Sequence, residues 1–96
     1  MQLYSRQEMQ YILGDKIGNI RKYEKKMTQK EMSVKADVPL STYARMEQLG
    51  EGSLKDFFKV LQALGRGNEL DKILVMSKES PVEVYERMKK EGSFKI

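Results

Sequence analysis

The chain has 96 residues, of which 40% are hydrophobic and 33% are charged, and its formal net charge is +4. A chain of this length forms one hydrophobic core, and its composition is that of an ordinary soluble globular domain. The absence of cysteine and histidine excludes disulfides, thiolate nucleophiles and imidazole bases. It also restricts any metal site to carboxylate ligands. We therefore expect no enzyme, no cofactor and no metal.

The sequence also lacks signals for membrane insertion or secretion. No apolar run approaches the roughly 18 residues of a membrane span, and polar residues interrupt every apolar stretch near the N-terminus. These features favour a cytoplasmic protein without a membrane partner.

Basic residues gather between positions 16 and 35. They either attract phosphates or an anionic surface, or they form an ordinary solvated helix face.

A first helix is predicted from Ser5 onward, because Ser5 and Glu8 have the spacing of a capping box. Its apolar residues follow the helical period and form one stripe, Met9, Ile12, Leu13, Ile17 and Ile20. Gly14 and Gly18 each weaken a helix by roughly 1 kcal/mol relative to alanine. Two interpretations follow: the helix breaks or starts later near residue 13, or the glycines permit close packing of another helix.

A second and a third helix follow, separated by a short turn. Thr28 and Glu31 form a second capping box, and Asp37 suits the left-handed turn that ends this helix. Pro39 fixes its own backbone angle, which favours the start of a new helix. The third helix is predicted over residues 40–49, before a glycine. Two short helices joined in this way form a helix-turn-helix, here at about residues 28–49.

Three further helices are predicted in the C-terminal half. Ser53 opens the fourth, which has the strongest amphipathic stripe of the chain and ends at Gly65. A fifth is predicted over residues 68–76, where the apolar residues are Leu70, Ile73 and Leu74. A sixth is predicted over residues 81–90, because Ser80 can cap it and a proline follows at the first helical position. The predicted fold class is therefore all-α, a bundle of five or six helices.

The helix-turn-helix is predicted to have one buried and one outer face. Helical spacing directs five residues toward the core, Met32, Ala36, Val38, Tyr43 and Met46. The outer face of the third helix presents Leu40, Ser41, Ala44 and Arg45. Short side chains let such a helix approach base edges in the major groove, where arginine pairs with guanine and apolar groups contact thymine methyls. The alternative is a helical hairpin whose polar outer face has no ligand.

Contacts to DNA phosphates are expected beside this face. The Gln29 side chain can bond a phosphate or a base edge, and the first-turn backbone amides near Gln29 and Ser53 are available to phosphates. The expected positioning residues are Gln29, Lys30, Thr42, Ser53 and Lys55.

Several stretches between residues 12 and 74 match the pattern of one known family. Its first-helix pattern is matched by Leu13, Gly14, Ile17, Ile20 and Arg21. Its second helix opens with Thr-Gln-x-Glu, matched by Thr28, Gln29 and Glu31. Its turn and third helix are matched by Val38, Thr42, Tyr43, Met46 and Glu47. On these residues the chain resembles the phage lambda repressor and Cro-like (XRE) helix-turn-helix family, and residues 53–64 are similar to the fourth helix of HipB-like antitoxins.

The resemblance implies a lambda repressor-like five-helix DNA-binding domain over residues 1–76, with an additional C-terminal helix and tail over residues 77–96. It assigns base reading to Leu40, Ser41, Ala44 and Arg45 and a phosphate contact to Gln29. It also implies an ion pair between Arg21 and Glu47. The segment after Arg21 is one residue longer than is common in the family, and Lys22 is the alternative partner of Glu47.

A homodimer is expected, because one helix-turn-helix contacts only a few base pairs and members of the family bind inverted repeats as twofold dimers. The candidate dimer residues are Val75, Met76, Val84, Tyr85 and Met88. The alternative is that the sixth helix folds back on its own core.

The sequence thus predicts a transcriptional regulator that binds double-stranded DNA sequence-specifically, as a repressor on an inverted-repeat operator. The alternative is an antitoxin-like interaction module whose main partner is a protein such as a toxin, with DNA autoregulation secondary.

Overall fold

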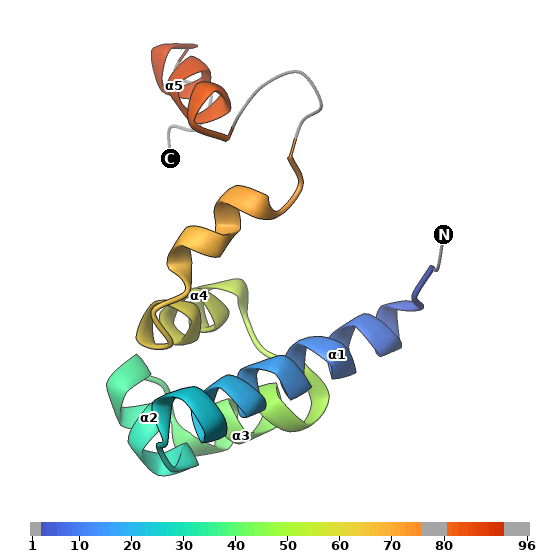
Figure 1. The fold of residues 1–96 in the computed structure, drawn as a ribbon, viewed down its shortest axis with the longest axis vertical. Coiled ribbons are helices and arrows are strands. Elements are labelled where there is room, and N and C mark those ends of the chain that lie inside the picture. The colour runs from blue at the N-terminus through green and yellow to red at the C-terminus, as the bar shows by residue number, and fades with distance from the viewer. Residues whose placement is uncertain (1–2, 76–80, 92–96) are drawn as a thin grey trace.

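The computed structural model of the protein describes residues 3–75 and 81–91. This part of the chain is all-helical and contains no strand, as the sequence predicts at the level of fold class. In chain order the elements are α1 (Arg6–Asn19), the π-helix η1 (Ile20–Lys25), α2 (Gln29–Ala36), α3 (Leu40–Leu49), α4 (Leu54–Ala63), the 3₁₀-helix η2 (Gly67–Lys72) and α5 (Pro81–Glu91). Figure 1 shows α1 to α4 gathered in one body, with η2 leading from α4 toward α5. None of the described helices is both long enough and apolar enough to cross a membrane.

Helix α1 begins where its capping box predicts. The Ser5 hydroxyl accepts a hydrogen bond from the Glu8 amide at 3.1 Å, and the Glu8 carboxylate accepts one from the Ser5 amide at 2.8 Å. The helix then continues without interruption through Gly14 and Gly18. The interpretation in which it breaks or starts near residue 13 is therefore wrong.

Gly14 lets α1 lie directly against α3. A Cβ atom at Gly14 would stand 2.4 Å from the carbonyl oxygen of Glu47 and 2.8 Å from that of Met46. Both oxygens belong to the backbone of α3, which cannot rotate aside as a side chain would. A Cβ at Gly18 would lie 3.3 Å from the Glu47 carboxylate. The interpretation of these glycines as positions of close helix packing is confirmed.

The π-helix η1 continues α1 by one wide turn. Each hydrogen bond of a π-helix spans five residues instead of four, so the turn accommodates an additional residue. It ends at Lys26, which has a left-handed backbone with φ 57° and whose amide donates to the carbonyl of Arg21. Arg21 is buried in this arrangement, whereas Lys22 is exposed. Arg21 rather than Lys22 therefore faces the interior.

The helix-turn-helix forms with the expected boundaries. The Thr28 hydroxyl accepts from the Glu31 amide at 3.1 Å, and the Glu31 carboxylate accepts from the Thr28 amide at 2.8 Å. Asp37 ends α2 in the left-handed region with φ 59°, and the extended Pro39 immediately precedes α3. Helix α3 ends at Gly50, whose φ of 65° favours glycine.

The hydrophobic core lies where α1, α2, α3 and α4 meet. Its buried residues are Ile17, Met32, Ala36, Val38, Tyr43, Met46, Val60, Ala63 and Leu64. All five core residues predicted for the helix-turn-helix are among them. The predicted stripe of α1 is buried only toward its C-terminal end, because Ile17 is 2% exposed whereas Met9 is 54% exposed.

The fifth predicted helix is wrong in type and length. Residues 67–72 form the 3₁₀-helix η2, and the backbone is extended at Ile73. The apolar residues expected to hold this helix on the core are exposed: Leu70 is 43%, Ile73 53% and Leu74 95% exposed. A short α-helix is stabilised mainly by packing of its apolar face. Without that packing, and after two nearby glycines, this segment forms only a short 3₁₀-helix.

Helix α5 begins at Pro81, as its sequence predicts, and extends to Glu91. The capping residue expected before it, Ser80, lies outside the described residues. Figure 1 shows α5 beyond η2 and apart from the helices that surround the core. The interpretation in which the last helix folds back on the core is therefore not what the structure shows.

Candidate nucleic-acid interface

The four residues predicted to read bases share the outer face of α3. Leu40, Ser41 and Arg45 are exposed and Ala44 is partly buried, while Tyr43 and Met46 point into the core. This division follows from helical spacing, because residues one, four and five positions after the first lie on one side. The result is an outer surface of short side chains that ends in one long cation.

The Arg45 guanidinium does not extend alone into solvent. Its Nη2 donates a hydrogen bond to Oε1 of Glu51, which lies in the loop between α3 and α4. Both side chains are exposed, at 63% for Arg45 and 46% for Glu51. Periodicity could not predict this contact, because Glu51 lies beyond the helix and belongs to no repeating pattern.

A shallow hollow of about 310 Å³ lies beside this ion pair. Its lining residues are Thr42, Arg45, Glu51, Gly52, Ser53 and Asp56. The structure thus brings together three of the predicted DNA contacts, Thr42, Arg45 and Ser53. Lys30 and Lys55 are exposed but do not line the hollow. Two carboxylates, Glu51 and Asp56, stand among the predicted contacts, and composition alone did not reveal them there.

The helix caps use part of the hydrogen-bonding capacity that was expected for phosphates. At α4 the Ser53 hydroxyl accepts from the Asp56 amide at 3.0 Å. At α2 the Thr28 hydroxyl accepts from the Glu31 amide. The Ser53 and Thr28 oxygens therefore stabilise their own helices, as N-cap side chains generally do.

The Gln29 side chain is bonded within the protein. Its side-chain Nε2 donates to Glu47 Oε1 at 2.9 Å, and the residue is partly buried. The sequence predicts that this side chain bonds a phosphate or a base edge, and in the structure one of the two N–H donors of its amide group is used by Glu47. The physical reason is that a buried carboxylate requires several donors.

The Glu47 carboxylate is the centre of a buried hydrogen-bond network. Arg21 binds it through two bonds, Nε to Oε2 at 2.5 Å and Nη2 to Oε1 at 3.0 Å. The Tyr43 hydroxyl also donates to Oε2, and Arg21 Nη1 donates to the Met27 carbonyl at 2.8 Å. The side chains of Arg21 and Glu47 are each only 9% exposed. This network ties η1, α2 and α3 together, and the implied Arg21–Glu47 pair is present.

The network shifts the pKa values of its members. Burial by itself would raise the pKa of Glu47, but the bonds from Arg21, Tyr43 and Gln29 outweigh it and hold that pKa below its ordinary value. The hydrogen bond to Glu47 raises the pKa of Arg21, against the opposing effect of burial. Burial, reinforced by the Glu47 carboxylate, raises the pKa of Tyr43. The pair is therefore ionised at neutral pH and the phenol keeps its proton.

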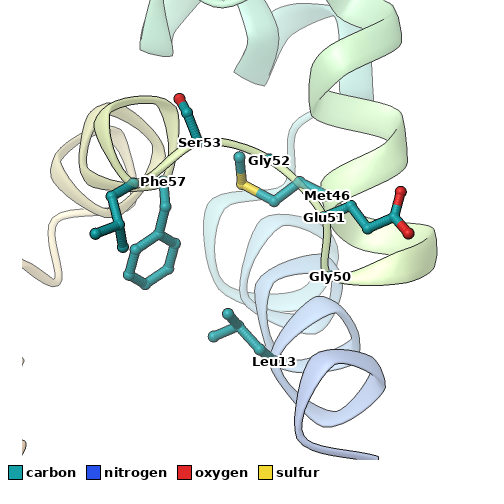
Figure 2. A pocket seen from close by; sticks show the side chains of 8 residues that line it. Leu13, Met46, Gly50, Glu51, Gly52, Ser53 and Phe57 are labelled. Atoms are coloured by element: carbon teal, nitrogen blue, oxygen red, sulfur yellow. The ribbon is translucent and has the colours of Figure 1, made fainter. Parts of the chain in front are cut away.

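An apolar hollow of about 200 Å³ opens on the other side of the α3–α4 loop. Figure 2 shows the side chains of Leu13, Met46 and Phe57 directed into it, from α1, α3 and α4, while the Glu51 carboxylate points away. Leu54 at its edge is 71% exposed. No sequence pattern singled out this hollow, because its lining comes from three separate elements.

The predicted dimer residues lie in the C-terminal part of the chain. Val75 follows η2 and is 53% exposed, and Tyr85 on α5 is 57% exposed. Met88 is partly buried. Met76 and the side chain of Val84 lie outside the described residues.

In residues 3–75 and 81–91 no group of three or more acidic side chains could hold a metal ion. No family model, no curated protein and no solved structure matches the chain.

Proposed function

We propose that the protein is a sequence-specific double-stranded DNA-binding transcriptional regulator, acting as a dimeric repressor on an inverted-repeat operator. The observation that carries the proposal is the outer face of α3. Short side chains at Ser41 and Ala44 precede an exposed arginine, so the helix can approach the floor of a major groove. In this role Arg45 pairs with guanine, and Leu40 and Ala44 contact thymine methyl groups.

The rigidity of the opposite face supports this role. Base recognition requires that the reading helix be held in one position relative to the DNA backbone. The buried network around Glu47 fixes α3 to η1 and α2, and Gly14 allows α1 to pack against its backbone. The exposed Lys30 and Lys55 stand in elements that flank α3, where cations would meet phosphates.

The resemblance to the lambda repressor-like family supports the same proposal for the arrangement of α1 to α4. In this interpretation α2 and α3 are the helix-turn-helix and η2 stands in place of the fifth helix. A second copy joins through the C-terminal part, where Val75 and Tyr85 expose apolar surface. Two α3 helices would then meet half-sites about one helical turn apart.

The test begins with sites selected from random DNA by the full chain. Fluorescence anisotropy then compares the selected site with a scrambled one at several salt concentrations. The Arg45→Ala variant should lose about 1–3 kcal/mol on the selected site and little on the scrambled one. Lys16→Ala, which removes an exposed positive charge from α1, is the matched control and should weaken both sites equally. Equal affinity of the wild-type protein for both sites would rule out sequence-specific recognition.

A second candidate function is that of an antitoxin-like module that binds a partner protein. The observation that favours it is the exposed apolar surface, which includes the hollow at Leu13 and Phe57 and the segment with Leu70, Ile73 and Leu74. Exposed apolar patches on a protein surface often mark sites of interaction with another protein. Co-purification of the protein encoded by the neighbouring gene, abolished by Leu54→Asp but not by Arg45→Ala, would establish this function.

A further inference from the structure

We infer that Glu51 is a positioning residue for Arg45 and sets how strongly the protein prefers guanine. The inference rests on the proposed function of α3. It assigns a role to a carboxylate that a simple electrostatic account of DNA binding would regard as unfavourable.

The contact leaves the reading edge of the guanidinium accessible. Arg45 donates to Glu51 through Nη2, and a guanidinium carries five N–H donors in a planar fork. One bond to a carboxylate therefore restrains the plane while other donors remain for the O6 and N7 atoms of guanine. A flexible arginine loses conformational freedom when it binds a base, and this loss weakens binding. An arginine that is already restrained in the free protein loses less on binding.

The loop that carries Glu51 is held in place by its neighbours. The Gly50 carbonyl accepts a bond from the Gln10 side chain at 3.3 Å, and the Gly50 amide donates to the Met46 carbonyl at 3.0 Å. A Cβ at Gly50 would lie 2.0 Å from the Gln10 carbonyl oxygen, so α1 and the loop are in direct backbone contact. The Glu51 side chain is directed away from the apolar hollow (Figure 2). Its carboxylate is therefore held on the side of the loop where Arg45 lies.

The negative charge of Glu51 has two effects of opposite sign. It repels DNA phosphates of any sequence, which weakens binding to all sites. It also orients Arg45, which strengthens binding only where a guanine is present. Asp56 lines the same hollow and carries the same charge, but the Arg45 contact is made by Glu51. A comparison of the two carboxylates therefore separates orientation from charge.

The experiment measures the preference for guanine as a ratio: the dissociation constant for a site with the Arg45-dependent guanine replaced by adenine, divided by the dissociation constant for the selected site. Glu51→Ala should lower this ratio about twofold to fivefold, an effect that restraint of one long side chain by an exposed ion pair can supply. Asp56→Ala should leave the ratio unchanged, although both variants should bind scrambled DNA more tightly. An unchanged or increased ratio in Glu51→Ala would overturn the inference.

A second measurement needs no DNA. The ¹⁵N relaxation of the Arg45 side-chain Nε reports its motion in the free protein. Glu51→Ala should increase that motion, whereas Asp56→Ala should not; equal motion in all three proteins would overturn the inference. Failure of the proposed function gives a different result, in which the wild-type protein shows no preference between selected and scrambled DNA. In that case Arg45 reads no base, and the role assigned to Glu51 fails with it.

Discussion

Helix α3 contributes to two arginine–glutamate pairs that lie on its opposite sides. On the inner side Glu47 accepts two bonds from Arg21, and both side chains are 9% exposed. On the outer side Arg45 donates one bond to Glu51, and both side chains are largely in solvent. Both pairs join a guanidinium to a carboxylate. Removing one partner of a buried pair, however, leaves an uncompensated charge in the interior. An exposed pair contributes little because water solvates either partner alone. Burial thus separates a pair that holds the fold from one whose partners water can solvate separately.

The largest expected effect is that of removing the buried carboxylate. Glu47→Ala should lower the free energy of unfolding by about 3–5 kcal/mol, because Arg21 would remain buried without its partner. Urea denaturation followed by circular dichroism measures this change. Glu51→Ala is the matched control on the outer side and should cost less than about 1 kcal/mol. Similar losses in the two variants would contradict the distinction between the pairs.

A substitution in the close contact between α1 and the inner side of α3 should lower the stability nearly as much. Gly14→Ala should destabilise the protein by about 1–3 kcal/mol, because the new methyl group would overlap two backbone carbonyls of α3. Gly67→Ala is the control, since a Cβ there would meet no atom within 4 Å. Thermal unfolding compares the two variants, and equal melting temperatures would show that α1 can shift away from α3 at little cost.

The ionisation of Glu47, in the inner pair, should be visible in how the free energy of unfolding depends on pH. The pKa of Glu47 is lowered in the folded protein, so folding is favoured while this group is ionised. Its contribution is complete above the ordinary glutamate value of 4.5 and is lost as the pH falls through the lower folded-state value. The free energy of unfolding, measured by denaturation at several pH values between neutral and 2, should therefore fall more steeply with decreasing pH for the wild-type protein than for Glu47→Gln. Parallel curves would show that Glu8 and Glu31, whose pKa values the capping boxes also lower, account for the acid sensitivity.

The smallest effect on stability is expected at the outer pair. Arg45→Ala should change the free energy of unfolding by less than about 1 kcal/mol. It should nevertheless weaken binding to a selected DNA site, as proposed above. A combined measurement of unfolding and DNA affinity on one preparation tests this separation. A loss of stability as large as that of Glu47→Ala would show that Arg45 is part of the scaffold.

Much of α1, α2 and α3 could be predicted because the signals are local. The capping boxes at Ser5 and Thr28 each depend on residues three positions apart, and both form as expected. Burial on α3 follows from its helical period, which correctly separates Tyr43 and Met46 from the outer face.

The incorrect or missing predictions depend on tertiary context. The apolar spacing of Leu70, Ile73 and Leu74 suits an α-helix, but no core surface receives these side chains. The contact between Arg45 and Glu51 joins a helix to a loop, and the inward direction of the Gln29 amide depends on the buried Glu47. Such contacts become visible only when the elements are placed in space.

The π-helix η1 has a consequence for the gain or loss of single codons. Its wide turn contains one residue more than an α-helical turn, and Arg21, which belongs to the buried network, lies at its start. A deletion at Tyr23, which is 69% exposed, would leave Arg21 before the change and Thr28 after it. The segment between α1 and α2 can thus lose one exposed residue while the corner made by α2 and α3 stays the same.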